Sequence, residues 1–202
     1  MLKFIPCDLQ IHDNDIIARL VYETEPSLSA LLFGKPKDKA LSNLNSIIAT
    51  PGSSLSSDHI YLAVENDCIL GLTVLYRGKD INKKQESKSI SEALGGYSLF
   101  RLYFYDRLIM NRLLTNHVEK DQLYVSNVCV DTAHQGRGIG RFLLENIISY
   151  ARSKHCQSII LDVSKDNERA IYLYKKMGFH IAKNRNSRLF GVSIFQMINT
   201  LD

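Results

Sequence analysis

The apolar positions in the second half of the chain switch between two spacings, and each switch marks a new element. An apolar strand-like run at residues 121–131 is followed by apolar positions at helical spacing from about 139 to 154. A buried-type strand at 158–164 then precedes a helix at 167–178. This order predicts two parallel strands joined by a right-handed crossover. Two more strand-like runs, FHIAKN and GVSIFQMI, close the chain.

The first half predicts a short strand, several helices and a hairpin. The opening LKFIPCDL is strand-like, and residues 13–50 carry helical apolar spacing that Pro26 interrupts. Two strand-like runs then surround the polar pair Asn66–Asp67, which predicts a hairpin. Together the two halves predict one α/β domain over residues 1–202, with a mixed central sheet flanked by helices.

Residues 79–120 do not fit that alternation, and we interpret them as an insertion. INKKQESKS, at 81–89, is polar and predicts a loop. The stretch ISEALGGYSLFRLYFYDRLIMNRLL is rich in Tyr and Phe, and its second half predicts a helix from recurring leucine and isoleucine positions (Leu102, Leu108, Ile109 and Leu113). The aromatic run YSLFRLYFYDR would line an acceptor pocket, form a dimer surface or cover the sheet.

The turn QGRGIG, at residues 135–140, places three glycines at alternate positions directly before a helix. A dinucleotide fingerprint fails because its third glycine position holds Arg141, and a P-loop fails because no Gly-Lys-Ser/Thr follows. The pattern Q-x-x-G-x-G fits Gln135, Gly138 and Gly140. Free N–H groups at such a helix start favour a bound anion, and Arg137 and Arg141 would add charge. The alternative is a tight connection that needs glycine for its geometry alone.

Composition narrows the class of protein. The 202 residues are 45% hydrophobic with a net charge of +4 and no dense basic run, so nucleic-acid binding is not indicated. The four cysteines form no CxxC pair and the histidines no metal-ligand spacing, so we expect a reduced chain without a metal site. Without a signal peptide or an apolar run of membrane-spanning length, we expect a cytoplasmic protein.

The segment VSNVCVDTAHQGRGIGRFLLENIISYARSKHCQSIILDVSKDNERAIYLYKKMGF resembles the acetyl-CoA-binding core of the GNAT superfamily of N-acetyltransferases. The resemblance covers about residues 122–180, and the first 120 residues match only in the order of their elements. The resemblance implies the family's mixed sheet, a cofactor core at about 121–182, acetyl-CoA as the cosubstrate and an amine as the acceptor. We expect the helices at 13–50 and the insertion to build the acceptor site.

The resemblance assigns cofactor-binding positions. The pantetheine arm would pair with the backbone of Val128, Cys129 and Val130. The pyrophosphate would lie on the turn and the helix start, a set formed by Gln135, Gly136, Arg137, Gly138, Ile139, Gly140 and Arg141. Asn167 would make a polar contact to the cofactor, act as a helix cap, or do both. We do not expect Cys129 to be a nucleophile, because direct transfer to an amine needs no acyl-enzyme.

Two residues are candidates for the chemistry. Tyr174 lies two helical turns from Asn167, and by the resemblance it protonates the departing thiolate; the alternative is an aromatic side chain packed in the core. Tyr172 is expected to point elsewhere. Asp162 interrupts an apolar strand where some similar enzymes carry a general base; otherwise it pairs with a basic group, and water takes the amine proton.

The sequence therefore predicts an acetyltransferase that moves an acetyl group from acetyl-CoA to a primary amine of a small molecule or protein by direct transfer. The alternative is a non-catalytic CoA-binding regulatory module. We expect no nucleic-acid or membrane partner, and a homodimer is one arrangement that the aromatic insertion would allow.

Overall fold

The computed structural model describes residues 1–105, 118–187 and 192–201. Its strands form one sheet in the order β1-β2-β3-β4-β5-β7-β6. The strands are β1 (Lys3–Pro6), β2 (Ile60–Glu65), β3 (Cys68–Arg77), β4 (Gln122–Val130), β5 (Ser158–Ser164), β6 (His180–Ser187) and β7 (Val192–Thr200). Among the strands of the described residues, only β4 and β5 pair in parallel, as the crossover predicts, and every other neighbouring pair is antiparallel. The predicted mixed α/β sheet is confirmed.

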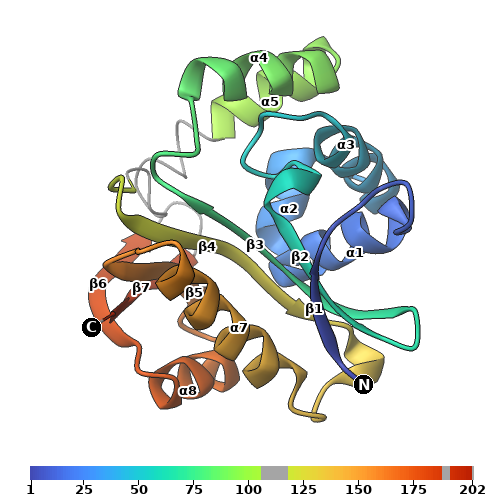
Figure 1. Cartoon of the computed structure of the whole chain (residues 1–202). Coiled ribbons are helices and arrows are strands. Elements are labelled where there is room, and N and C mark those ends of the chain that lie inside the picture. Colours follow the sequence, from blue (N-terminus) through green and yellow to red (C-terminus); the bar gives the residue numbers. More distant parts are fainter. Residues whose placement is uncertain (106–117, 188–191, 202) are drawn as a thin grey trace.

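Helices cover both faces of the sheet. The helices are α1 (Asn14–Thr24), α2 (Pro26–Phe33), α3 (Lys37–Ala49), α4 (Lys83–Ala93), α5 (Gly96–Tyr105), α7 (Ile139–Ser153) and α8 (Glu168–Lys176). Figure 1 shows α1 to α3 on one side and α7 and α8 on the other, while α4 and α5 lie beyond α2 and α3. Each side has its own apolar core, and burial of these two cores holds the layers together.

The hairpin prediction is confirmed. Asn66 and Asp67 both have positive φ, 50° and 62°, and they join β2 to β3. This conformation at both central residues matches the right-handed twist of the flanking strands. The two closing strand-like runs also form strands, β6 and β7, which pair antiparallel. β7 lies between β5 and β6, so this strand is internal to the sheet.

The predicted loop at 81–89 is wrong, because α4 occupies most of it. Asn82 caps this helix by accepting hydrogen bonds from the backbone N–H groups of Lys84 and Gln85. The helix is polar almost all round, and Ser89 is its buried residue, so apolar spacing gave no signal. The helix predicted from Leu102 begins earlier, as α5, and its positions Leu108, Ile109 and Leu113 lie outside the described residues.

The two central strands separate at the site. β4 and β5 pair from Gln122 opposite Ser158 to Val125 opposite Leu161. At Ser126 the register between β4 and β3 shifts by one residue, which is a β-bulge. A bulge bends its strand, and in the described part of the chain no β5 residue pairs with β4 beyond it. We call this opening between β4 and β5 the strand gap.

Candidate active site

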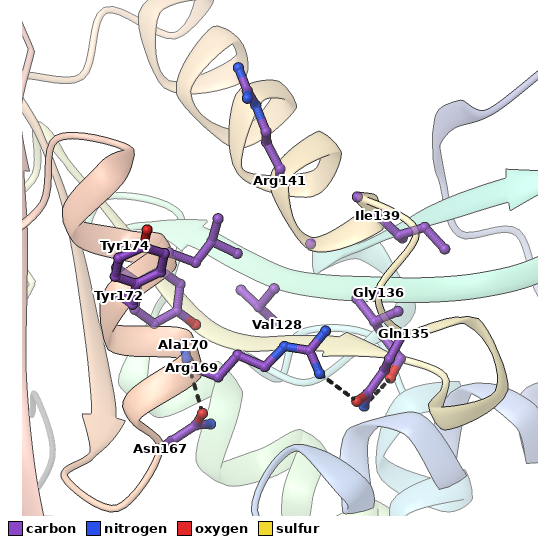
Figure 2. Close-up of a pocket in the computed structure, with 14 residues that line it drawn as sticks. Val128, Gln135, Gly136, Ile139, Arg141, Asn167, Arg169, Ala170, Tyr172 and Tyr174 are labelled. Carbon is purple, nitrogen blue, oxygen red and sulfur yellow. Dashed lines mark hydrogen bonds between the residues drawn. The ribbon is translucent and has the colours of Figure 1, made fainter.

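A cavity of about 410 Å³ lies between the end of β4, the start of α7 and the first turns of α8. From β4 and the glycine turn it is lined by Val128, Val130, Gln135, Gly136 and Gly138. Helix α7 contributes Ile139, Gly140 and Arg141, and α8 with its cap contributes Asn167, Arg169, Ala170, Tyr172, Leu173 and Tyr174. Figure 2 shows these side chains converging from the three elements. The cavity thus collects most of the sequence-predicted cofactor positions.

The end of β4 presents backbone groups to the cavity. The N–H of Asp131 donates to a β3 carbonyl at 2.9 Å. Hydrogen-bonded positions alternate along an antiparallel pair, so Cys129 also directs its N–H and C=O toward β3. Val128 and Val130 therefore direct theirs into the strand gap. Both valines line the cavity, whereas Cys129 does not, and burial raises the pKa of its thiol to about 11.

The glycine turn is shaped by conformation as well as by space. Gly136 and Gly138 both have φ of 81°, a left-handed conformation that other residues rarely adopt, so turn geometry alone requires two of the three glycines. A Cβ at Gly140 would meet Leu173 of α8 at 3.3 Å, so the third glycine lets α7 and α8 approach each other. The N–H groups at the start of α7 have no partner within the helix and face the cavity end, as an anion site requires.

The arginines fall into two groups. Arg137 ion-pairs with Glu65 of β2 at 3.1 Å and does not line the cavity. Arg141 lines it, but its Nε donates to Glu145 at 2.8 Å. Arg169 lines the cavity and reaches across from α8 to donate to Gln135 at 3.2 Å (Figure 2).

Sequence reasoning missed Arg169. The available signal was a basic residue in the first turn of the helix that follows the Asn167 cap. Only the structure shows that the first turn of α8 faces the glycine turn across the cavity.

Of the two roles predicted for Asn167, helix cap and cofactor contact, the hydrogen bonds of the structure contain the helix cap. Its Oδ1 accepts from the backbone N–H of Ala170 at 3.1 Å, so it caps α8, and the residue also lines the cavity. The cap uses Oδ1 and leaves the Nδ2 group as a donor for a ligand. The expectation that Tyr172 points elsewhere is wrong, because Tyr172 lines the same cavity, although its side chain is largely exposed. The cavity spreads over more of the α8 surface than one helix face.

Tyr174 is a buried residue of the cavity wall. It is 8% exposed, and its ring lies 5.9 Å from that of Phe179. Burial, followed by the nearby Cys129 thiol, raises the pKa of Tyr174 to about 12. The hydroxyl therefore stays protonated near neutral pH, which suits a proton donor and not a base.

Asp162 faces the opposite side of the sheet from Tyr174. Its neighbours Leu161 and Val163 pack with Tyr174 and α7, so the alternation of a strand turns Asp162 away from them. On that side the Tyr124 hydroxyl of β4 donates to Asp162 Oδ2 at 2.9 Å. Asp162 is the first β5 residue beyond the paired stretch, so it lies at the edge of the strand gap.

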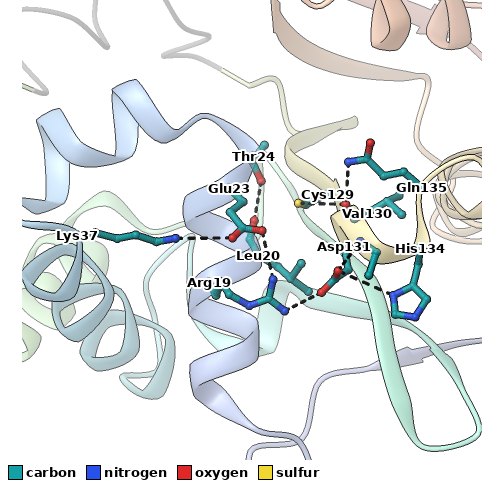
Figure 3. A network of polar contacts seen from close by, with 11 residues as sticks. Arg19, Leu20, Glu23, Thr24, Lys37, Cys129, Val130, Asp131, His134 and Gln135 are labelled. Atoms are coloured by element: carbon teal, nitrogen blue, oxygen red, sulfur yellow. Dashed lines mark hydrogen bonds and ion pairs between the residues drawn. The ribbon is translucent and has the colours of Figure 1, made fainter.

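An ion-pair network ties the end of β4 to α1. Arg19 Nη2 donates to Asp131 Oδ2 at 2.7 Å, and Arg19 Nη1 donates to Glu23 at 3.3 Å (Figure 3). The other oxygen of Asp131 accepts from the N–H of Ala133 and so caps the short turn before the glycines. The Arg19 hydrogen bond and then the Ala133 N–H lower the pKa of Asp131. The start of the glycine turn is thus anchored to the layer of α1 to α3.

Two features are absent from the described residues. No group of three or more His, Cys, Asp or Glu side chains there has an arrangement that would hold a metal ion. Within the same ranges, no helix is long and apolar enough to cross a membrane.

Comparison with known proteins gives one family. The profile of the Acetyltransferase (GNAT) family matches residues 45–179. The N-alpha-acetyltransferase RimI of Mycobacterium tuberculosis is 37% identical over 75 residues, which are 36% of this chain and 46% of that protein. The [Ribosomal protein bS18]-alanine N-acetyltransferase of Salmonella typhimurium is 36% identical over 67 residues, 33% of this chain and 45% of that protein. The matched segment spans less than half the length of these curated relatives.

Solved structures extend the likeness to the whole chain. An N-acetyltransferase from Staphylococcus aureus Mu50 aligns with a TM-score of 0.77 at 20% identity, covering 97% of this chain and 99% of that one. A GNAT family acetyltransferase from Elizabethkingia anophelis with acetyl-CoA bound aligns with a TM-score of 0.59 at 16% identity, covering 99% and 98%. At these identities the alignments show a shared fold.

Proposed function

The chain belongs to the acetyltransferase (GNAT) family, and on that premise we propose that it transfers an acetyl group from acetyl-CoA to a primary amine by direct attack. The observation that carries the proposal is the strand gap. The cavity reaches one side of this gap, and Asp162 lies at its edge on the other side. A thioester in the cavity and an amine on the Asp162 side would meet in the gap, so no acyl-enzyme is required.

The cavity residues would hold acetyl-CoA by groups they already present. The N–H and C=O groups of Val128 and Val130 pair with the amides of the pantetheine arm, as an added strand would. The N–H groups at the start of α7 and the guanidinium of Arg169 bind the pyrophosphate. Entry of the arm displaces the side-chain amide of Gln135, which donates to the Val130 carbonyl at 3.3 Å. Arg137 has no part in this arrangement.

The proposed chemistry uses one side chain on each side of the sheet. The ammonium group of the acceptor gives a proton to Asp162, and the freed nitrogen lone pair attacks the thioester carbonyl carbon. The attacking nitrogen, positively charged in the tetrahedral intermediate, gives its second proton to water. Collapse of the intermediate then breaks the C–S bond, and Tyr174 protonates the departing thiolate. Solvent then reprotonates Tyr174 and deprotonates Asp162. The thiolate is disfavoured in a buried site, so a donor held beside the sulfur lowers the barrier.

The acceptor is proposed only as a primary amine. The relatives' names cover an alanine of ribosomal protein bS18 and, for the glucosamine 6-phosphate N-acetyltransferase of Trypanosoma brucei brucei, an amino sugar phosphate. These acceptors share an amine and little else. We therefore assign acceptor choice to the layer of α1 to α3 and to α4 and α5, which lie outside the cavity walls.

The proposal also covers the cellular location of the protein and its oligomeric state. We propose a cytoplasmic protein that works without a metal ion, in keeping with four cysteines that are all free thiols. A homodimer through the aromatic face of α5 stays a prediction, which light scattering across a concentration series would check.

Release of free CoA from acetyl-CoA, measured against a panel of amines, tests the proposed function. The panel should contain polyamines, amino sugars, amino acids and peptides with free N-termini. We expect rapid CoA release with at least one class and a matching gain of 42 Da on the acceptor, the mass of an added acetyl group by simple stoichiometry. Tight CoA binding without transfer to any amine would favour the alternative, a non-catalytic CoA-binding module.

A further inference from the structure

We propose that Tyr124 is a positioning residue for Asp162: its hydroxyl holds the carboxylate at the edge of the strand gap, in the orientation and charge state needed to take the acceptor's proton. This inference rests on the proposed function and adds to it a residue that does not line the cavity. It concerns the proposed general base, Asp162, whose orientation the residues around the cavity do not explain.

The contact bridges the two strands where they begin to separate. Tyr124 lies opposite Ile160 in the last part of the parallel pair, one position before the final pair of Val125 and Leu161. Its hydroxyl donates to Asp162 Oδ2 at 2.9 Å, two β5 residues further along. The bond therefore spans from the rigid paired part of the sheet to the first carboxylate beyond it. A carboxylate tethered there cannot rotate freely away from the gap.

The tyrosine is suited to donate at every working pH. Tyr124 is 5% exposed. Burial first, and then the charge of Asp162, raise the pKa of Tyr124 well above its ordinary value. The hydroxyl hence remains protonated when the carboxylate is ionised. A hydrogen bond donated to a charged acceptor stabilises the charged form relative to the neutral one.

Other polar groups reach the same side of the sheet from three elements. Tyr76 of β3 lies with its ring 5.5 Å from that of Tyr124. Burial first, and then the charges of Glu86 of α4 and Asp162, raise the pKa of Tyr76. The charge of Arg185 of β6 lowers the pKa of Tyr124. These groups stay in place when the Tyr124 hydroxyl alone is removed. A change in pH dependence after that removal is then assigned to the hydroxyl.

The test compares Tyr124→Phe with Tyr76→Phe, each measured for kcat/KM against pH with an amine that the wild type accepts. Loss of a hydrogen bond to a carboxylate makes it easier to protonate, so the acid limb of the Tyr124→Phe profile should move up by about one pH unit. The rate should recover at high pH to within about threefold of the wild type. Tyr76→Phe, which removes a neighbouring hydroxyl outside the contact, should keep the wild-type profile.

An unshifted acid limb in Tyr124→Phe overturns the proposal, and so does a rate lowered equally at every pH, which is the mark of a purely structural role. Melting temperature and CoA affinity are measured on each variant, so a folding defect is seen separately. Asp162→Asn and the double variant complete the cycle, and Tyr124→Phe should add no further loss once the carboxylate is gone. If Asp162→Asn itself keeps the wild-type rate and profile, the base of the proposed function fails, and the positioning role fails with it. Acetyl transfer by the wild type would still stand.

Discussion

Arg19 of α1 and Asp131 at the end of β4 lie 112 residues apart in the chain and form a hydrogen-bonded ion pair of 2.7 Å. Asp131 directly follows the β4 positions that face the strand gap and precedes the glycine turn. One carboxylate therefore joins the layer of α1 to α3 to the start of the anion site. The pair is partly exposed, so its strength depends on pH and salt.

Asp131→Asn should lower stability in a pH-dependent way. The pKa of Asp131 is lower in the folded chain than in the unfolded one, so the carboxylate stabilises the fold above the unfolded value of about 3.9. This contribution is lost as the pH falls through the lowered value. Asn can still cap Ala133, so the variant removes mainly the charge. We expect a loss of about 1 kcal/mol in unfolding free energy at pH 7, shrinking below about pH 4.

Urea titrations at pH 7, 5 and 3 check this difference. Glu145→Gln is the control, since its ion pair with Arg141 is exposed and should contribute little at any pH. A stability loss in Asp131→Asn that stays constant down to pH 3 would contradict the ion-pair explanation.

CoA and acetyl-CoA should stabilise the fold more than other nucleotide cofactors do. A ligand present at about 100 times its dissociation constant adds about 2.7 kcal/mol to the unfolding free energy. The cavity combines a strand edge for the pantetheine amides with an anion site, and NAD, FAD and ATP lack the pantetheine arm. Thermal shift assays give the comparison. A larger shift with NAD than with CoA would contradict the cofactor assignment.

Gly138→Asn should weaken CoA binding at least tenfold while the fold survives. Asn tolerates the left-handed conformation of Gly138 better than a β-branched residue does, and a Cβ there meets no protein atom within 4 Å. The added side chain would then point into the cavity that the pyrophosphate needs. Gly178→Asn, with φ of 90° away from the cavity, is the control for a strained substitution outside the site, and its new Cβ would also lie 3.2 Å from Asn199 Nδ2. Calorimetry measures affinity and circular dichroism the fold; unchanged affinity would mean that the phosphates bind elsewhere.

Arg169→Gln should weaken CoA binding by about tenfold, the effect of losing one charge-assisted hydrogen bond. Arg137→Gln provides a matched control, because Arg137 carries the same charge in the same region but pairs with Glu65 outside the cavity. We expect it to change affinity less than threefold. Dephospho-CoA separates the two phosphate groups: an equal loss with both ligands places Arg169 at the pyrophosphate. Equal effects of the two variants would show that only net charge matters.

Tyr174→Phe should lower kcat by about 10²-fold or more, with acetyl-CoA affinity and melting temperature nearly unchanged. Phe keeps the ring that packs beside Phe179 and removes only the hydroxyl. Tyr150→Phe on α7, outside the cavity, is the control. A Tyr174→Phe enzyme that keeps more than about a third of its kcat, when chemistry limits turnover, would assign the proton to solvent or another side chain.

The sequence by itself determined the elements whose signals are local. Residues that are neighbours in the sequence specify the glycine turn, the α8 cap and the periodic runs on either side. These local signals predicted the order of β4, α7, β5 and α8. Local signals failed where an element buries almost nothing. Helix α4 has one buried residue, Ser89, and so it has no apolar period by which to be found.

The tertiary structure alone decided what meets across the sheet. The separation of β4 from β5 depends on the bulge at Ser126 and on which strand each edge pairs with. The spacing of apolar residues in the sequence predicts neither of these. The contacts of Tyr124 with Asp162 and of Arg169 with Gln135 join residues 38 and 34 positions apart. Such contacts follow from the packing of whole layers, which sets the relative placement of elements only after each has formed. Sequence could therefore nominate Tyr174 and Asp162, while only the fold placed them on opposite sides of one gap.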